Sequence, residues 1–422
     1  MLTQTDRVRR LTDEQRETIR EMCQWSARLF DITIEQALSH LEAFPDDPLT
    51  YAQSYRMLRD QQPYRMLEAG MAQQTMRMAH SAITTYVKLM ERAERGDYPH
   101  DLLAPPRPKG DGAFFPLTIP VNVISVKTGG MLRLPVSRPF RAEHPGMSNV
   151  FLPLAPHVLD NEIRQVRIRM LPVTEEIWLD VTYRTDDVET TGPRPHVMGM
   201  DLGVNNLVAA VTTAGTSLLV DGRRLKSANH RYKEHMQKAR RDAVASTGSI
   251  RETRAMATAT QTRERRIRDA FHKAAAAVVA HCEENNIGTV VCGLTRHVTD
   301  TRPPWTQSFA ELPIDRLAAT IESTCAIHGV TFVEQEDAYT SRASFMDGDP
   351  VPDADVRDDG RLKFAGRRVH RGLYRTHDGL LLNADLNAAA NVLSKMARQQ
   401  HQVLDMDAVA RALTAQPQIA KV

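Results

Sequence analysis

Cysteine, aromatic residues and long apolar runs are all scarce in this chain of 422 residues, which has 4 Cys and 5% aromatic residues. The cysteines lie at positions 23, 282, 292 and 325 and form no CxxC pair, which argues against a disulfide scaffold or a zinc ribbon. The longest apolar runs, residues 274–280 and 379–382, are far shorter than the roughly 20 residues that a membrane span needs. Residues 1–20 are charged throughout and contain no apolar stretch of the kind that a secretory signal requires. We therefore expect a cytoplasmic protein with no membrane contact.

The composition as a whole shows no strong bias. Hydrophobic residues make up 42% and charged residues 25% of the chain, which is close to the average for folded globular proteins. These values argue against wholesale disorder and fibrous architectures. A chain of this length is expected to form about two to four domains, each with its own core.

Helical periodicity marks the first part of the chain. Residues 11–42 begin with Thr12, which can cap a helix, and continue with apolar residues at helical spacing. Pro45 and Pro48 end this pattern, and residues 71–95 then present a second broad apolar face. The pattern predicts a helical domain over residues 1–110.

Short alternating segments follow a connector rich in Pro and Gly. Turn signals separate these segments, which is typical of antiparallel strands. Strands are expected within residues 116–126, 131–136, 165–170 and 177–183. We predict a small β domain over residues 111–195.

The order of elements changes to α/β beyond residue 195. Three meandering strands come first, and helices then alternate with strands, which is the order of an RNase H-like α/β layer. The strands are expected at residues 197–200, 207–212, 217–220, 289–292 and 330–335, and the helices at residues 226–285, at 314–328 and from about residue 384.

Basic residues gather in two segments although the formal net charge is only +2. Residues 223–268 contain fourteen Lys and Arg against four acids, and residues 357–375 contain seven against two. Such segments in a near-neutral chain suggest local contacts with a polyanion. A solvated helix face would produce the same pattern, and charge alone does not decide between the two.

Two aspartates occupy positions where catalytic carboxylates are often found. Asp201 ends an apolar strand and is followed by Gly203, which lets backbone or ligand approach closely. Asp385 lies in the first turn of the last helix, where it could also simply serve the helix dipole. Metal-dependent phosphodiester cleavage needs several such acids, because two Mg²⁺ ions about 4 Å apart must be held by hard oxygen ligands.

The third acid is harder to assign. RNase H-like nucleases are expected to place a Glu at the end of the fourth strand, where this chain has Cys292 and Gly293. The neighbouring fifth strand, about 4.8 Å away, ends in a run of acids that includes Glu336 and Asp337. Period-two alternation puts these two on opposite faces. We predict that Glu336 is the third ligand.

Several motifs resemble the TnpB family of RNA-guided nucleases, which insertion sequences encode and which are ancestors of type V CRISPR effectors. Residues 199–207, Gly-Met-Asp-Leu-Gly-Val-Asn-Asn-Leu, are similar to the family's first RuvC motif nearly letter for letter. Residues 225–229 and 271–275 resemble the helical segment that follows it. Residues 339–347 resemble the block before an inserted nucleic-acid-binding domain, and residues 370–374 and 383–389 resemble its exit and the third RuvC motif. The strong similarity spans about residues 196–395.

Two departures from the family pattern stand out. The common pattern has a four-Cys zinc ribbon between the last two motifs, but residues 341–382 contain no Cys. The comparison therefore implies that no structural zinc is present. The fourth-strand Glu is also missing. A branch of the family has both departures together, with the Glu relocated to just before the Tyr-Thr-Ser block, where Glu336 lies.

The resemblance implies an α/β and α+β multidomain protein with an RNase H-like RuvC nuclease domain. A helical recognition domain (residues 1–110) and a small β-barrel wedge domain (residues 111–195) would precede it. The nuclease domain would comprise residues 196–338 and, with the last helix and tail, residues 383–422. The nucleic-acid-binding insert would lie between them, at residues 339–382.

By the same resemblance, a guide RNA pairs with one strand of a target double-stranded DNA beside a short flanking motif. A RuvC centre of Asp201, Glu336 and Asp385 would cut the DNA with two Mg²⁺ ions, with Mn²⁺ as a substitute. The protein would be cytoplasmic in a prokaryote, as a monomer or homodimer. The residues expected to contact nucleic acid are Arg223, Arg224, Lys226, Arg231, Lys233, Arg240, Arg241, Tyr339, Ser341, Arg342, Arg367, Arg368 and Arg371.

Other functions fit the sequence less well. A guide-dependent DNA-binding repressor without useful cleavage is disfavoured by the presence of all three candidate acids. An actin-like kinase or ATPase would share the Asp201-Leu202-Gly203 loop but needs a second Asp-Gly-rich loop and an adenosine motif, and neither occurs. A DDE transposase is disfavoured by the order of the acids and by the long β-rich front region.

Overall fold

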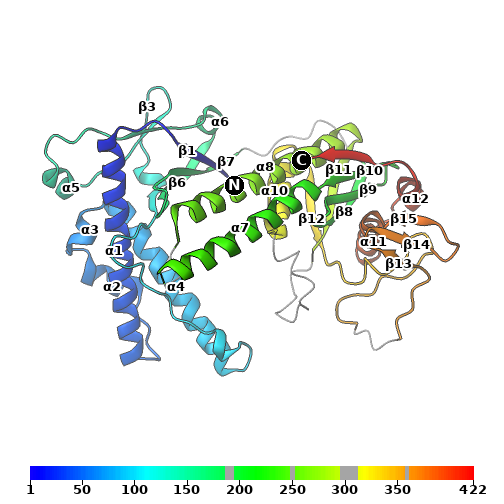
Figure 1. Ribbon diagram of the computed structural model, residues 1–422, viewed down its shortest axis with the longest axis horizontal. Coiled ribbons are helices and arrows are strands. Elements are labelled where there is room, and N and C mark those ends of the chain that lie inside the picture. The colour runs from blue at the N-terminus through cyan, green and yellow to red at the C-terminus, as the bar shows by residue number, and fades with distance from the viewer. Residues whose placement is uncertain (186–193, 248–251, 295–311, 357–360) are drawn as a thin grey trace. The chain divides into compact units, whose positions relative to one another are not determined.

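A computed structural model describes residues 1–185, 194–247, 252–294, 312–356 and 361–422 (Figure 1). The chain divides into two compact units, Met1–Asp186 and Asp187–Val422. Each unit has its own buried hydrophobic clusters. The finer division into five parts stays a prediction.

Helices form one layer of the first unit. They are α1 (Asp13–Ala43), α2 (Tyr51–Leu58), α3 (Gln62–Arg65) and α4 (Ala69–Glu94), followed by a 3₁₀ turn at His100–Leu102. Thr12 starts α1 with a capping box, so two of the free N–H groups at the helix end are satisfied. The hydroxyls of Ser26 and Thr75 join α1 to α4 at 2.9 Å. The helices expected at residues 11–42 and 71–95 are confirmed as α1 and α4.

Two antiparallel sheets complete the first unit. The larger has the order β1-β7-β6-β2, and the smaller has the order β3-β4-β5. The expected barrel is therefore not confirmed, and the pairing of β1 with β7 was not expected from the sequence. The elements are β1 (Leu2–Val8), β2 (Leu117–Pro120), a 3₁₀ turn at Val121–Val123, β3 (Val126–Lys127), β4 (Met131–Arg133), α5 (Arg138–Glu143), β5 (Phe151–Pro153), α6 (Pro156–Leu159), β6 (Glu162–Met170) and β7 (Ile177–Arg184).

A six-stranded sheet organises the second unit, with the order β12-β11-β8-β9-β10-β16. In chain order, β8, β9 and β10 come first and form an antiparallel meander. β11 then runs parallel to β8, and β12 parallel to β11. The strand next to β10 at the other edge, β16, was not expected from the sequence. The strands are β8 (His196–Leu202), β9 (Asn206–Thr212), β10 (Ser217–Asp221), β11 (Ile287–Gly293), β12 (Thr331–Gln335) and β16 (Gln418–Lys421).

Helices cover both faces of this sheet (Figure 1). α8 (Arg254–Glu284) and α10 (Ile314–Ile327) pack on one face, and α11 (Ala384–Gln399) and α12 (Met406–Thr414) on the other. The helix α7 (Arg223–Thr247) leaves β10 and lies against α8. The single helical region expected at residues 226–285 is thus two helices, joined through residues 248–251, which lie outside the described residues.

A small antiparallel sheet leads into α11. It consists of β13 (Arg367–His370), β14 (Leu373–Arg375) and β15 (Leu381–Asn383). Its three strands lie at the end of the segment expected to be the nucleic-acid-binding insert. None of the helices that the structure describes combines the length and apolar character needed to cross a bilayer.

Candidate nuclease site

Asp201 lies near the end of the central strand β8, between two small residues. Its strand neighbours are Ala209 on β9 and Gly293 on β11. Directly opposed residues of a sheet point to the same face. Because neither neighbour has a long side chain, side chains from other segments can approach the Asp201 carboxylate on the face that carries α11.

The close approach of α11 to β8 brings Asp385 to this place. A Cβ at Gly199 would lie 2.5 Å from the carbonyl oxygen of Ala389 and would also collide with Leu393. Only glycine therefore allows the helix to lie so close to the strand. Asp385, Ala389 and Leu393 follow one another at i, i+4 spacing on one side of α11. Since Ala389 and Leu393 lie over Gly199, Asp385 lies toward Asp201, two residues further along β8.

Three polar contacts fix Asp385. Asn206, at the start of β9, donates its side-chain N–H to Oδ2 at 2.9 Å, and Arg368 of β13 donates to Oδ1 at 2.8 Å. Asn383 caps α11 by accepting from the backbone N–H groups of Asp385 and Leu386. The sequence prediction identified Asp385 but missed Asn206, although Asn206 lies within the motif at residues 199–207.

The surroundings of Asp201 oppose its ionisation. Burial raises the pKa of the Asp201 carboxyl well above its usual range, and the negative charges of Asp385 and Asp337 raise it further. The positive charge of Arg368 lowers the pKa of Asp201 in part. The site therefore has more negative charge than its own cation balances, which is the condition under which carboxylates bind a metal ion.

Glu336, the acid predicted to be the third ligand, has a different set of partners. Its carboxylate accepts from the Nζ of Lys395 on α11 and from the backbone N–H of Ala338. Lys395 is fully buried, with 0% of its side chain exposed, so its ammonium depends on Glu336, on Asp353 at 3.8 Å and on the carbonyl oxygens that it contacts. Glu336 is not among the charged groups that shift the pKa of Asp201. These contacts tie Glu336 to Lys395 and Ala338, and its role as the third ligand stays a prediction.

Asp337 occupies the place beside Gly293 where a fourth-strand side chain would lie. A Cβ built at Gly293 would be 3.2 Å from the Cβ of Asp337 and 2.7 Å from Cγ2 of Val392. Gly293 is the direct strand neighbour of Asp201, so Asp337 enters the site through the gap that glycine leaves. Asp337 therefore places a carboxylate beside Asp201 where the fourth strand, which ends in Cys292 and Gly293, has none.

The donor set has the chemistry that Mg²⁺ requires. Asp201, Asp337 and Asp385 offer hard carboxylate oxygens, and the amide of Asn206 orients one of them. In the part of the chain that the structure describes, no three His, Cys, Asp or Glu side chains are close enough to share a single ion. The four cysteines are free and buried.

A second stripe of α11 holds the segment that carries Glu336 and Asp337. The side-chain amides of Asn387 and Asn391 donate to the carbonyl oxygen of Ala343 at 2.8 and 2.7 Å, and that of Asn391 also donates to Thr340 O at 2.8 Å. Lys395, one turn further, donates to Pro352 O at 2.9 Å. The i, i+4, i+8 spacing of these polar residues is the sequence signal that could have identified the stripe.

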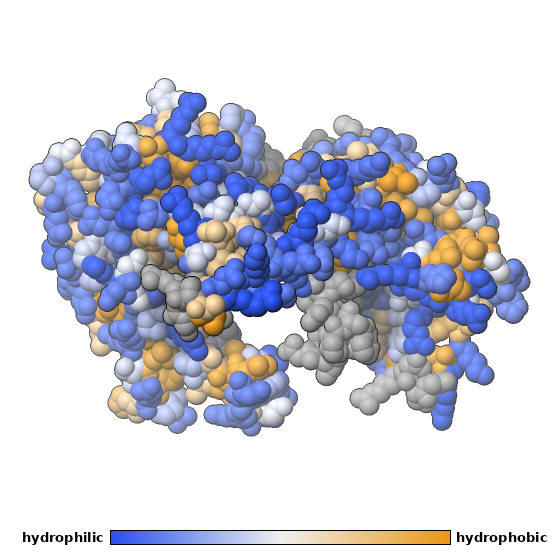
Figure 2. Space-filling view, in the orientation of Figure 1, coloured by the Kyte–Doolittle hydropathy of each residue, from blue (hydrophilic) through white to orange (hydrophobic). Residues whose placement is uncertain are grey.

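The predicted basic contacts on α7 lie mostly on its surface. Arg223, Arg224, Arg231, Arg240 and Arg241 are exposed, whereas Lys226 and Lys233 are half-buried. The surface over α7 is strongly hydrophilic (Figure 2). Lys226 donates to Asn205 Oδ1 at 2.8 Å, which ties α7 to the loop that follows Asp201.

The other predicted contacts divide into two groups. Arg367, Arg368 and Arg371 are exposed on the small sheet, and Arg357 of the same basic segment lies outside the described residues. Ser341 and Arg342 are exposed beside Tyr339, whose hydroxyl donates to Val356 O at 2.5 Å. The structure thus brings Arg368 to Asp385. The contacts of the other basic residues with nucleic acid stay a prediction.

Comparisons with known proteins agree with the resemblance seen in the motifs. Residues 180–298 match the family model OrfB_IS605, described as "Probable transposase". A search of the curated proteins finds no match. The chain is similar to a solved structure described as "Cryo-EM structure of the Cas12f1-sgRNA-target DNA complex", with a TM-score of 0.55 and 12% identity over 90% of this chain and 83% of that chain.

Two further solved structures give TM-scores too low to compare folds. A CRISPR-Cas12f ternary complex has a TM-score of 0.32 and 12% identity over 89% of this chain and 80% of that chain. An AacC2c1 complex with sgRNA and extended non-target DNA has a TM-score of 0.41 and 8% identity over 85% and 63%. The likeness to Cas12f1 shows the fold alone, a mixed α/β, multidomain fold of the Cas12 kind. With the family match over residues 180–298, the resemblance of this chain to the TnpB family is confirmed.

Proposed function

We propose that this protein is an RNA-guided DNA endonuclease whose second unit is a RuvC-like nuclease domain. The observation that carries the proposal is the approach of Asp337 and Asp385 to Asp201 at one end of a mixed sheet, near enough for both charges to raise the Asp201 pKa. Among the described residues these carboxylates do not share one ion as they stand, so a bound cation would draw them closer together. The strand order β10-β9-β8-β11-β12 supports the RNase H-like assignment, since it is a meander followed by two parallel crossovers.

The partners follow from the family and from the charge of α7. The similar Cas12f1 structure is described as a complex with sgRNA and target DNA. The corresponding partners of this protein are a guide RNA and a target double-stranded DNA beside a short flanking motif. The protein would act as a monomer or homodimer in a prokaryotic cytoplasm. Exposed arginines of α7 would contact phosphates, because such contacts position nucleic acid without reading its sequence.

The acids would hold Mg²⁺, or Mn²⁺ in its place. Two bound ions would supply activation of the attacking water and stabilisation of the leaving oxygen. Asn206 orients the Asp385 carboxylate, and a bound cation would lower the pKa of Asp201, which burial and then the charges of Asp385 and Asp337 raise. Arg368 holds Asp385 and would move aside or bind a DNA phosphate when the site is loaded.

The third carboxylate of the proposed site is Asp337 and not Glu336. Asp337 lies against Gly293, the strand neighbour of Asp201, whereas Glu336 neutralises the buried Lys395. Their roles are therefore separable: one acid serves the chemistry and the other serves the fold.

Cleavage and binding assays with the purified protein, guide RNA, target DNA and Mg²⁺ test the proposal. Asp201→Ala and Asp337→Asn should each reduce the cleavage rate at least about 100-fold, because metal ligation contributes several kcal/mol of transition-state stabilisation. Target binding should change little. A double variant, Glu336→Gln with Lys395→Met, removes the buried pair together and should keep measurable cleavage.

Two outcomes would change the assignment. Guided binding without cleavage, unchanged by Asp201→Ala, would favour the repressor. Loss of cleavage in the double variant with full activity in Asp337→Asn would return the third position to Glu336. Thermal unfolding of each variant separates a lost ligand from a lost fold. Zinc analysis of the same preparations tests the prediction that no structural zinc is present.

A further inference from the structure

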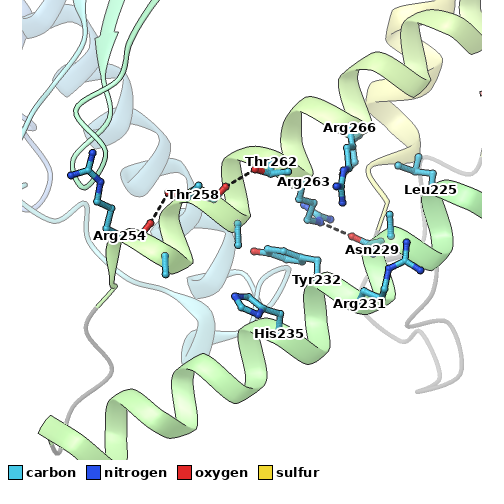
Figure 3. A pocket seen from close by; sticks show the side chains of 14 residues that line it. Leu225, Asn229, Arg231, Tyr232, His235, Arg254, Thr258, Thr262, Arg263 and Arg266 are labelled. Atoms are coloured by element: carbon cyan, nitrogen blue, oxygen red, sulfur yellow. Dashed lines mark hydrogen bonds between the residues drawn. The ribbon is translucent and has the colours of Figure 1, made fainter.

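A pocket of about 720 Å³ lies between α7 and α8, and none of the three acids lines it (Figure 3). Its volume falls within the range of about 300–1,000 Å³ that is usual for small-molecule sites. Apolar side chains from both helices line it, among them Leu225, Ala259 and Ile267. These residues provide a surface against which a flat, partly apolar group could pack.

The charge of the lining is of one sign. Arg231, Arg254 and Arg266 line the pocket, and no Asp or Glu does. None of these three arginines forms an ion pair within the described ranges of the chain. A fourth arginine, Arg263, is held at the base, where its Nε donates to Asn229 at 2.5 Å and its Nη1 to Glu264 at 2.9 Å. The pocket therefore favours an anionic ligand.

Two ring side chains point from α7 into the space between the helices (Figure 3). They are Tyr232 and His235. The Tyr232 hydroxyl is hydrogen-bonded to Thr260 of α8 at 3.0 Å, and the guanidinium of Arg263 lies 5.3 Å from the ring centre. The ring is thus fixed in orientation, with one face covered by Arg263. A fixed aromatic face beside unpaired arginines is the combination that binds single-stranded nucleic acid.

We propose that this pocket binds one unstacked nucleotide of a single strand, with the base against Tyr232 and the phosphate on Arg231 and Arg266. The inference relies on the proposed function only for the source of the strand. An apolar helix from a second copy would leave the arginines covered and unpaired, which is unfavourable. RNA and DNA both present a nucleoside phosphate to the pocket, so the test uses one strand of each.

Binding of short single strands to the full chain tests this without guide RNA, target or Mg²⁺. The probes are fluorescein-labelled U₁₂ RNA and dT₁₂ DNA, and matched strands that carry one 2-aminopurine, whose fluorescence falls on stacking. Tyr232→Leu should weaken binding at least about 5-fold and reduce the 2-aminopurine quenching, since stacking on one aromatic ring is worth that much per base. Tyr232→Phe, which loses only the Thr260 contact, should stay within about 2-fold of the wild type.

The arginines supply a second readout. Arg231→Gln with Arg266→Gln should reduce the slope of log K against log salt by about 1.4 and also reduce the quenching. The matched control is Arg240→Gln with Arg241→Gln on the same helix, which should lower the slope but leave the quenching unchanged. Equal quenching in all variants, or a Tyr232→Leu affinity equal to that of wild type with an unchanged melting temperature, would overturn the proposal. Pocket-dependent binding in a protein that does not cleave would contradict only the proposed nuclease, whereas cleavage without pocket dependence would contradict only the pocket.

Discussion

At the residue scale, Asp201 holds its proton more tightly in the folded protein than in the unfolded chain. Burial and the charges of Asp385 and Asp337 raise its folded-state pKa above the unfolded value. Between these two pKa values the folded state binds more protons, so the free energy of unfolding falls as the pH rises. Below the unfolded pKa the carboxyl is protonated in both states and contributes no pH dependence.

Asp201→Asn should therefore raise the melting temperature of the metal-free protein at pH 8. The amide keeps the size of the side chain and removes the charge that burial opposes. Each kcal/mol gained corresponds to about 2–4 °C in the unit concerned. Calorimetry in EDTA at pH 4 and pH 8 measures the effect, which should shrink at the lower pH. A variant that melts below the wild type at pH 8 would contradict this assignment of the charge.

Lys395 should contribute to the stability of the fold through its buried charge. Its buried ammonium binds Glu336 and the carbonyl oxygen of Pro352. Lys395→Met should lower the free energy of unfolding by about 1–3 kcal/mol, because the partners lose a charged donor. Urea unfolding measures the change. Arg398→Met is the matched control on the same helix: its pair with Asp353 is half-exposed and should be worth less than about 1 kcal/mol. Equal effects of the two variants would disprove the special role of burial.

At the element scale, α11 connects the site to the fold. One side carries Asp385, Ala389 and Leu393 against β8, and another carries Asn387, Asn391 and Lys395 against the segment that contains the other acids. A shift of this helix relative to the sheet would therefore alter the relative positions of the three acids.

Gly199→Val should move α11 away from β8. The added side chain would meet Leu393 and the carbonyl oxygen of Ala389, and overpacking of this kind costs about 1–3 kcal/mol. The free energy of unfolding, measured with denaturant, and the affinity for Mn²⁺, measured by electron paramagnetic resonance, should both decrease. Adding Leu393→Ala should recover only part of the stability, because the backbone of Ala389 still blocks the new side chain. Full recovery would show that the helix backbone does not approach so closely.

Most elements of the second unit were predictable because each has a local signal. The strands around Asp201 are apolar and bounded by Gly, and Asp385 follows a capping Asn383. The choice of Glu336 as the third ligand stays a prediction, and its neighbour Asp337 is the alternative that the proposed site uses. The register decides between the two acids: Gln335 pairs with Gly293, the neighbour of Asp201, so alternation from Gln335 leads to Asp337. The sequence alone did not give this register. The edge strands β1 and β16 have distant partners, which no local pattern indicates.

At the scale of the whole molecule, a net charge of +2 conceals a strongly basic α7. Arg240→Gln with Arg241→Gln should reduce the salt dependence of duplex DNA binding by about 1.8 in log–log slope, since each phosphate contact contributes about 0.9. Arg9→Gln with Arg10→Gln changes the net charge equally, on exposed residues of the first unit, and should have a smaller effect. Equal slopes for the two double variants would mean that net charge and not the position of the arginines determines binding.

The acidic centre destabilises the fold while the neighbouring stripe of α11 stabilises it, and this difference has an evolutionary consequence. Its carboxylates repel one another and Asp201 is buried, while Asn387, Asn391 and Lys395 on the neighbouring stripe of α11 donate hydrogen bonds that hold the adjoining segment. In the proposed nuclease, replacing one aspartate with its amide would remove a metal ligand and at the same time relieve the charge repulsion within the fold. A descendant of the proposed nuclease that only occupies its target would then be one codon change away and more stable than its parent.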